Sequence, residues 1–499
     1  MTKRGVTIAI AVAVALVIAR STVFLLWEQS AFDSDQAIFG PMAKHIAEGR
    51  AFPMFIYGDR YLMAVQAWLA APLFLVFEPS VALLKLPVVL INAGTAALLV
   101  VVLHRDAGLR PATALLASLF FAAMPPVMAK LLTETGGGNP EPFLYVLLLW
   151  VLRARPLAFG LVFAFGFVHR EFTAYGVTAL IAVAVLGDRR LNYERFRTVA
   201  LAGIGYFVVS QVIRAAYLFS HPFGPGSVIA MPLAGADNVA GLSGRYCFAP
   251  ETILPSMASL FGNFFGVVFG ATNHRMVEFG VRSTLTAGVP GLSTFWPVLG
   301  LILAAALVRV GWISIRDRKP IWTGAGAVGT FLLLVGLQSG VAYAVARCGR
   351  LEPDTLRYAL LMVYAGIGVV TLYFVYEPQR AWRRVMAAAV VAWTLTSAVS
   401  HALLVDEYLN RTPGGAQRVL ANYLVEAGIQ YARADYWTAY ITTFYTGERV
   451  IVASTTSVRI SSYQEQVAAQ GTDAVTIQRQ PCSDGGGTEA VAGNYWVCR

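Results

Sequence analysis

Two carboxylates open a polar segment directly after the first long apolar run of the chain. Asp33 and Asp35 precede Ile38, Met42 and Ile46, whose four-residue spacing predicts an amphipathic helix along a membrane surface. The dipole of a helix favours a carboxylate at its N-terminus, so capping alone explains such an acid. A carboxylate held near a reacting hydroxyl or amide also serves as a general base. Two acids beside a membrane span, with basic groups on the same side, favour chemistry for one of them.

An arginine follows this helix. The segment "YGDRYLMAVQAWLAAPLFLVF" places Arg60 between Asp59 and Tyr61, before a second apolar stretch. A guanidinium binds a lipid phosphate through paired hydrogen bonds. Pairing with Asp59, or extension of the side chain to the membrane interface, explains Arg60 equally well. The apolar stretch holds Pro72 and ends at Glu78, and we expect it to re-enter or skim the interface.

Three further turns carry ionisable residues close to lipid. They hold Lys130, Glu134 and Glu141; His169, Arg170 and Glu171; and Arg357 with Tyr358. Charged residues at membrane depth are costly and usually functional. Four turns on one face therefore predict a polar cavity that opens to the outer leaflet. A hydrogen-bonded turn residue remains an alternative role for His169, and an interfacial anchor remains one for Arg357.

The composition is that of a membrane protein. Of the 499 residues 57% are hydrophobic and 13% are charged, whereas soluble domains carry about 25% charged residues. Apolar runs that can cross a bilayer recur along the chain. We expect about eleven spans, near residues 5–27, 82–103, 112–129, 143–153, 157–168, 172–187, 198–219, 293–309, 321–345, 358–376 and 384–404. The first run is predicted to be an uncleaved span rather than a signal peptide.

The net charge of +10 does not indicate a nucleic-acid partner. The arginines lie in short clusters between apolar runs, where they set the orientation of the spans. A cytoplasmic N-terminus puts these basic loops inside and puts segments 28–81, 220–292 and 405–499 outside. This arrangement predicts a multi-pass protein of a bacterial inner membrane.

All four cysteines then lie on the extracytoplasmic face. An even number on an oxidising face suggests the disulfides Cys482–Cys498 and Cys247–Cys348, with four unpaired thiols as the alternative. The tail from about residue 405 alternates strand-like and helix-like segments, which predicts a small α/β domain. Within it, Asp435, Tyr436 and Trp437 are interpreted as a helix start with a packed aromatic face, rather than as a binding surface.

This arrangement resembles the GT-C superfamily of membrane glycosyltransferases, and particularly the protein O-mannosyltransferases and lipid A aminoarabinose transferases. These families place an Asp-Glu-x-x-(Phe/Tyr) motif on a surface helix after the first span, and Asp35 to Gly40 match it with Gln36 in place of Glu. The segment around Arg60 takes the place of their donor-binding stretch but lacks its Lys-Pro-Pro core. "LRYALLMVYAG" is similar to the Arg-Tyr start of a late span. The resemblance covers residues 1–404.

The resemblance implies a mainly α, polytopic helix bundle over residues 1–404; the α/β tail domain over 405–499 is predicted from its own pattern alone. It implies sugar transfer from a polyprenyl-phosphate donor to a protein, lipid or glycan acceptor outside the cytoplasm. Asp35 would be the general base, and Asp33 would be the cap. Candidates for the donor phosphate are Arg60, His169, Arg170 and Arg357. Candidates for orienting the acceptor are Asp33, Glu134, Glu141 and Tyr61.

No cofactor is expected besides the lipid-linked sugar. Glu134 and Glu141 offer oxygens to a divalent cation, but no spacing in the sequence demands a metal. The main alternative function is a transporter or lipid flippase, towards which Arg20 in the first span points. Transporters usually contain inverted repeats and mid-membrane charges, and no internal repeat is detected. A non-catalytic membrane subunit is a second alternative.

Overall fold

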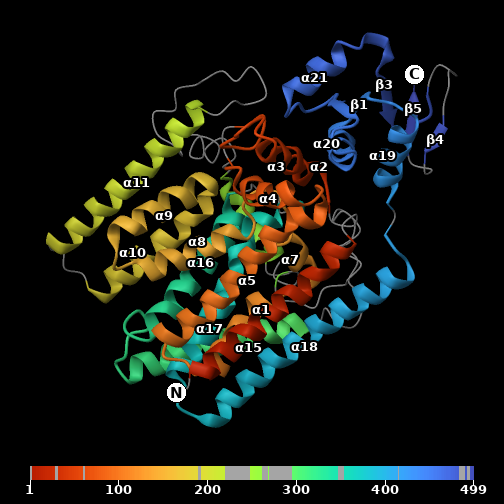
Figure 1. Ribbon diagram of the computed structural model, residues 1–499. Helices are drawn as coiled ribbons and strands as arrows, with labels where there is room; N and C mark the ends of the chain where they lie inside the picture. The colour runs from red at the N-terminus through yellow and green to blue at the C-terminus, as the bar shows by residue number, and fades with distance from the viewer. Residues whose placement is uncertain are drawn as a thin grey trace.

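The computed structural model describes most of the chain, and its helices dominate the fold (Figure 1). The described residues are 3–27, 32–59, 62–188, 193–219, 248–260, 268, 295–346, 353–413, 415–482, 489–491 and 495–498. Within these ranges, seven helices are long and apolar enough to cross a membrane. The long helices are α1 (Lys3–Leu26), α5 (Val81–Asp106), α11 (Tyr193–Phe219), α15 (Phe295–Arg316), α16 (Gly326–Val345), η6 with α17 (Pro353–Met362 and Val363–Tyr376) and α18 (Arg380–Asn410).

Shorter apolar helices, of 12 to 14 residues each, lie at the other four predicted spans and complete the bundle. They are α6 (Pro111–Ala122), α8 (Glu141–Leu152), α9 (Pro156–His169) and, after η2 (Glu171–Thr173), α10 (Ala174–Gly187). The remaining elements here are α7 (Pro126–Leu131), η3 (Pro250–Thr252) and α13 (Ile253–Ser259). The prediction of a polytopic helix bundle is confirmed.

The bundle has an inner and a lipid-facing layer. Inside, α16 and α17 pack backbone to backbone, because a Cβ at Gly336 would overlap the backbone of Ala365. Small residues allow such close approach between helices in a membrane. The outer helices expose large apolar side chains, including Phe207 at 58%, Leu301 at 72% and Leu395 at 60%. A surface of this kind is stable in lipid rather than in water, so the chain is a multi-pass membrane protein.

The segment after α1 folds into three short helices at one end of the bundle. These are α2 (Ser34–Ala37), α3 (Phe39–Ala47) and α4 (Val65–Val76). Helix α4 is too short to span and exposes Leu75 and Val76, as expected for an interfacial helix. The expectation that α3 turns its apolar side to the membrane is wrong. Ile38, Met42 and Ile46 are buried in an apolar core that α3 shares with α4 and with side chains from residues 436–474. Protein rather than lipid therefore covers this face of α3.

The C-terminal unit (residues 416–498) is an α/β fold, as predicted. Its helices are α19 (Ala416–Glu426), α20 (Tyr436–Tyr445) and α21 (Ser461–Ala468), with η7 (Gly471–Asp473). Its strands are β1 (Tyr431–Ala434), β2 (Ile451–Ser454), β3 (Val475–Gln478), β4 (Glu489–Val491) and β5 (Tyr495–Cys498). The sheet order is β2-β1-β3-β5-β4, with β1 parallel to β2 and β3, and β5 antiparallel to β3 and β4. Helix α18 continues past the predicted boundary at 404 and ends at Asn410.

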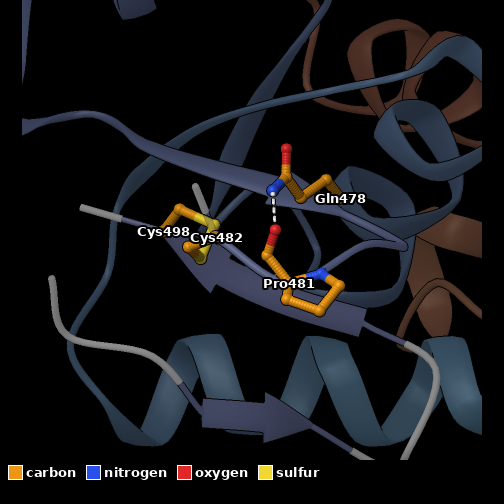
Figure 2. Close-up of a disulfide and its surroundings, with 4 residues drawn as sticks. All are labelled: Gln478, Pro481, Cys482 and Cys498. Atoms are coloured by element: carbon orange, nitrogen blue, oxygen red, sulfur yellow. Dashed lines mark hydrogen bonds between the residues drawn. A yellow bond between two sulfur atoms is a disulfide. The ribbon is translucent and has the colours of Figure 1, made fainter. Parts of the chain in front are cut away.

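A disulfide closes the end of the sheet (Figure 2). It joins Cys498 of β5 to Cys482, which follows β3. Beside it, Gln478 Nε2 donates to the Pro481 carbonyl at 3.2 Å. The predicted Cys247–Cys348 pair lies outside the described residues.

The C-terminal unit sits on the short helices that follow α1, at the end of the bundle far from the N-terminus (Figure 1). Phe444 of α20 packs on Phe32 and Phe74, with ring centroids 5.8 and 6.5 Å apart, and contacts Gly40. The two parts thus share one apolar core. The C-terminal unit is docked against the segment that carries the two acids.

Candidate active site

Asp35 lies in the first turn of α2, at the junction between the bundle and the C-terminal unit. The Tyr436 hydroxyl of α20 donates to Asp35 Oδ1 at 2.5 Å. On the other side, Arg357 Nη1 lies 3.8 Å from Asp35 Oδ2. The Asp35 side chain keeps 32% of its surface exposed. A carboxylate held by a hydroxyl and a cation, and still accessible, is suited to accept a proton.

Asp33 fulfils the predicted capping role. Its Oδ1 accepts a hydrogen bond from the Gln36 backbone N–H at 3.0 Å, which begins α2. Burial raises the pKa of Asp33, and the negative charge of Asp35 raises it further. The two acids therefore do different things, because Asp33 is bound to the start of α2 as a cap, whereas Asp35 is partly exposed and contacts Arg357 and the neighbouring unit.

Arg357 and Arg170 come from distant segments but lie against the same aromatic ring. Their guanidinium carbons are 5.5 and 5.8 Å from the centroid of Tyr358. Arg170 also lies 5.4 Å from the ring of Phe172 and is only 4% exposed. Cations stacked on aromatic rings keep an orientation without losing their charge. Arg357 is thereby fixed beside Asp35.

Lys130, Glu134 and Lys85 extend this acid–base group. Lys130 Nζ lies 4.0 Å from Glu134, and Lys85, a fully buried residue of α5, donates to the Phe24 carbonyl at 3.4 Å. Burial raises the pKa of Glu134 to about 7, although the charges of Lys130, Arg357 and Lys85 oppose the rise. Three cations and three acids thus surround the start of α2.

Two glutamines hold the loop that carries Glu134. Gln36 Oε1 accepts from the Thr135 N–H at 3.2 Å, and Gln66 Oε1 accepts from the Gly137 N–H at 3.2 Å. Both side chains are buried. Gln36 stands where the related motif has Glu, and here it is the amide oxygen of Gln36 that ties α2 to this loop.

Glu141, His169 and Arg170 form a second polar group behind that loop. Gln66 Nε2 donates to Glu141 Oε1 at 2.7 Å, and Tyr145 Oη pairs with His169 Nδ1 at 2.8 Å. Glu141 Oε2, His169 Nε2 and Arg170 Nε have no hydrogen-bond partner among the described residues. His169 is a hydrogen-bonded residue at the end of α9 and does not contact Asp35, so the structure separates it from the acid–base group.

Two predicted site residues, Arg60 and Tyr61, lie outside the described residues. Their neighbour Asp59 forms an ion pair with Arg459 of the C-terminal unit at 2.7 Å.

Three comparisons relate this arrangement to known proteins. No family model matches the sequence, and no curated protein matches it significantly. Solved structures do match. The ArnT structure from Cupriavidus metallidurans, determined with undecaprenyl phosphate, superposes with a TM-score of 0.58 at 10% identity, over 100% of this chain and 98% of that one.

Two oligosaccharyltransferase structures from Archaeoglobus fulgidus also match. The apo form has a TM-score of 0.54 at 13% identity, over 96% of this chain and 70% of that one. The AglB complex with an inhibitory peptide and dolichol phosphate has a TM-score of 0.53 at 12% identity, over 95% and 69%. ArnT and AglB are GT-C glycosyltransferases. This chain has the GT-C fold.

Sequence reasoning missed two residues that the GT-C fold brings to the site. Lys85 was hidden inside a predicted span, although a lysine in an apolar run is itself a functional signal. Tyr436 was assigned to a packed aromatic face. No local pattern connects it to Asp35, because the two residues are joined only by the docking of the C-terminal unit.

Arg20, the residue that pointed towards a transporter, has a structural role in this GT-C fold. It is 3% exposed and donates to Asn92 Oδ1 at 3.1 Å and to the Phe121 carbonyl. Its guanidinium also lies 5.0 Å from the Phe121 ring centroid. Arg20 therefore joins α1, α5 and α6.

Among the described residues, no three His, Cys, Asp or Glu side chains gather as a metal site. Binding of a divalent cation by Glu134 or Glu141 is untested; the sequence allows it but does not indicate it.

The proton on Glu134 makes stability depend on pH. The folded chain keeps this proton up to about pH 7, whereas an unfolded chain releases it near pH 4.3. The wild type should therefore lose up to about 4 kcal/mol of stability between these values as the pH rises. Glu134→Gln has no proton to release at this position and should lose no stability through it. The melting temperature of the variant minus that of the wild type should therefore be larger at pH 8 than at pH 4.5. An equal difference at both pH values would contradict the assignment.

Proposed function

We propose that this protein is a glycosyltransferase that moves a sugar from a polyprenyl-phosphate donor to an acceptor outside the cytoplasm. The observation that carries the proposal is Asp35, held between the Tyr436 hydroxyl and the Arg357 guanidinium. The GT-C fold supports the same class of reaction. The undecaprenyl phosphate in the Cupriavidus ArnT structure supports a lipid phosphate of that kind for this chain.

The proposed reaction needs a base and a cationic site. Asp35 accepts the proton of the acceptor hydroxyl or amide as its oxygen or nitrogen bonds to the anomeric carbon. The bond from that carbon to the phosphate oxygen breaks, and its electron pair leaves with the polyprenyl phosphate. Arg357, Lys85 and Lys130 stabilise the charge on the phosphate. The protonated Glu134 orients the acceptor by donating a hydrogen bond.

Arg170 and His169 belong to the second polar group and not to the group around Asp35. Because Arg170 and Arg357 lie against the same Tyr358 ring, we assign Arg170 the role of supporting that ring. The sugar is a hexose or pentose, and the acceptor is a protein, lipid or glycan. Arg60 remains a predicted phosphate ligand, and Tyr61 a predicted acceptor contact.

We further propose a bacterial inner-membrane location with a cytoplasmic N-terminus. The end of the bundle opposite Asp35 supports this orientation, because it carries basic residues such as Arg105 and Arg153, which pair with Asp106. The C-terminal unit then forms the extracytoplasmic domain, at about residues 405–499. Its Cys482–Cys498 disulfide suits an oxidising compartment.

The function is tested with the purified protein in lipid nanodiscs and a panel of polyprenyl-phosphate hexoses and pentoses. We expect one donor to lose its sugar and release polyprenyl phosphate when lipid, peptide and glycan acceptors are supplied. In parallel, the protein is placed in vesicles with a fluorescent polyprenyl phosphate. If the protein moves that lipid across the bilayer and releases no sugar from any donor, the glycosyltransferase proposal is rejected and the protein is a flippase.

Arg357 provides a sharper test of the donor site. Arg357→Ala should weaken binding of undecaprenyl phosphate by about 10- to 100-fold, because a charge-assisted hydrogen bond contributes about 1.5–3 kcal/mol. The exposed Arg411 is the matched control, since it lies beyond α18 on the linker to the C-terminal unit. Titration in detergent measures both variants. Unchanged affinity in Arg357→Ala would remove this residue from the phosphate site.

A further inference from the structure

Tyr436 belongs to the C-terminal unit, yet its hydroxyl contacts the acid at the centre of the membrane-domain site. The 2.5 Å hydrogen bond to Asp35 Oδ1 leaves Oδ2 facing Arg357. A carboxylate with one oxygen held in this way presents the other in a fixed direction. We propose that Tyr436 is a positioning residue for the Asp35 carboxylate, so that the C-terminal unit completes the catalytic site. This inference rests on the proposed role of Asp35 as base.

A second hydrogen bond fixes the same two helices in register. Ser34 Oγ, adjacent to Asp35, donates to the Tyr436 carbonyl at 2.6 Å. Ser34 is fully buried, and Tyr436 is 7% exposed. The two bonds run in opposite directions between neighbouring residues, so α20 has little freedom to slide along α2. The Tyr436 ring is also held by Tyr440, at a centroid distance of 5.4 Å.

The hydroxyl remains a donor throughout the pH range of life. Burial raises the pKa of the Tyr436 phenol well above its usual value, and the charge of Asp35 raises it further. A group that keeps its proton orients a carboxylate without competing for the proton that the carboxylate accepts. Tyr436 is therefore suited to hold the base and not to replace it.

Docking of the C-terminal unit does not depend on this hydroxyl. Lys44 Nζ donates to the Gly447 carbonyl at 2.7 Å and lies 2.9 Å from Glu448 Oε2. The ring of Phe444 lies against Gly40 in the shared core. These contacts remain in Tyr436→Phe, which removes a single oxygen. The variant thus separates positioning of Asp35 from attachment of the unit.

Tyr440 supplies the matched control. Its hydroxyl is in the same helix and accepts from the Arg459 N–H at 2.6 Å, but it has no contact with Asp35. Tyr440→Phe therefore removes the same atom type with at least as large a structural disturbance. Ser34→Ala is a second variant, because it loosens the register and leaves both the tyrosine hydroxyl and the carboxylate in place.

The test uses the polyprenyl-phosphate sugar that the wild type accepts from the panel, and measures kcat and KM with it. Binding of undecaprenyl phosphate alone is measured separately. Tyr436→Phe should lower kcat by about 10- to 100-fold, because misplacing a reacting group by about 1 Å can cost about 10²-fold. Its KM, its affinity for undecaprenyl phosphate and the rate of proteolysis in linker 411–415 should stay within about twofold of wild type. Tyr440→Phe should keep kcat within about twofold, and Ser34→Ala should lie between the two.

The proposal is overturned if Tyr436→Phe keeps the wild-type kcat, or if Tyr440→Phe loses as much. If Tyr436→Phe fails to fold, a wild-type kcat in Ser34→Ala overturns it. Asp35→Asn separates the two levels of inference. If that variant is inactive while Tyr436→Phe is unaffected, only the positioning role fails. If Asp35→Asn stays active, or if the wild type uses no donor of the panel, both the proposed function and the positioning role of Tyr436 fail.

Discussion

Replacing Asp35 by Asn should lower sugar transfer by at least about 100-fold. An amide has nearly the shape of the carboxylate but cannot accept the proton of the attacking acceptor, and a positioned base contributes about 10²–10⁴-fold. The Tyr436 hydroxyl still finds an oxygen on the amide, so docking of the C-terminal unit and expression should be unchanged. Turnover is measured as release of polyprenyl phosphate from the donor that the wild type uses.

Asp33→Asn is the comparison that makes this result specific. Asn is as good an N-cap as Asp, so α2 should keep its start at the Gln36 N–H. We expect this variant to retain at least about one tenth of the wild-type rate, because its acid is assigned to capping. The opposite order of the two variants would transfer the role of base to Asp33, and full activity in both would remove the carboxylate mechanism.

Replacing Glu448 by Ala should destabilise the attachment of the C-terminal unit by about 3–5 kcal/mol. The Glu448 side chain is 8% exposed and lies 2.9 Å from Lys44, 2.7 Å from His45 and 2.5 Å from Arg50. The Tyr463 hydroxyl also donates to it at 2.8 Å. Without the carboxylate, buried donors from both parts of the protein lose their partner. A polar cavity of about 340 Å³ adjoins this cluster, but its lining does not include Asp35.

The effect should depend on pH. Burial alone raises the pKa of Glu448, but hydrogen bonds from His45, Arg50 and Lys44 outweigh it and hold that pKa well below its usual range. A carboxyl with a lowered pKa stabilises the fold above the pKa of the unfolded chain, about 4.3, and loses this contribution as the pH falls further. The difference in stability between the wild type and Glu448→Ala should therefore be largest at pH 6–8 and should shrink progressively as the pH falls below about 4.3.

Thermal unfolding and proteolysis of the linker at 411–415 measure this difference. Glu426 is the control, because it is an exposed glutamate on α19 of the same unit. Glu426→Ala should change the melting temperature by little. If Glu448→Ala unfolds and is cleaved like Glu426→Ala, the charge cluster does not hold the two parts together. Transfer activity should fall with detachment, since α20 would no longer reach Asp35.

Local patterns in the sequence predict the membrane helices and the C-terminal unit. Backbone polar groups in lipid must form hydrogen bonds within the chain, so continuous apolar runs form helices; seven of the eleven predicted spans are long helices and four are shorter ones. The alternation of residues after α18 predicted the α/β unit. Asp33 and Asp35 stood out because two carboxylates lie beside a membrane span with basic groups on the same side, and the capping role of Asp33 followed from its place before α2.

Which ionisable residues lie together depends on how distant segments of the chain pack against one another. Arg357 meets Asp35 across more than 300 residues, and His169 instead lies behind the loop of Glu134 with Tyr145. Lys85 belongs to the same group, although its sequence context is that of an ordinary span. Tyr436 reaches Asp35 because a shared apolar core and the Glu448 cluster dock one unit on the other. Such contacts arise from packing between distant segments, which no local spacing of residues encodes.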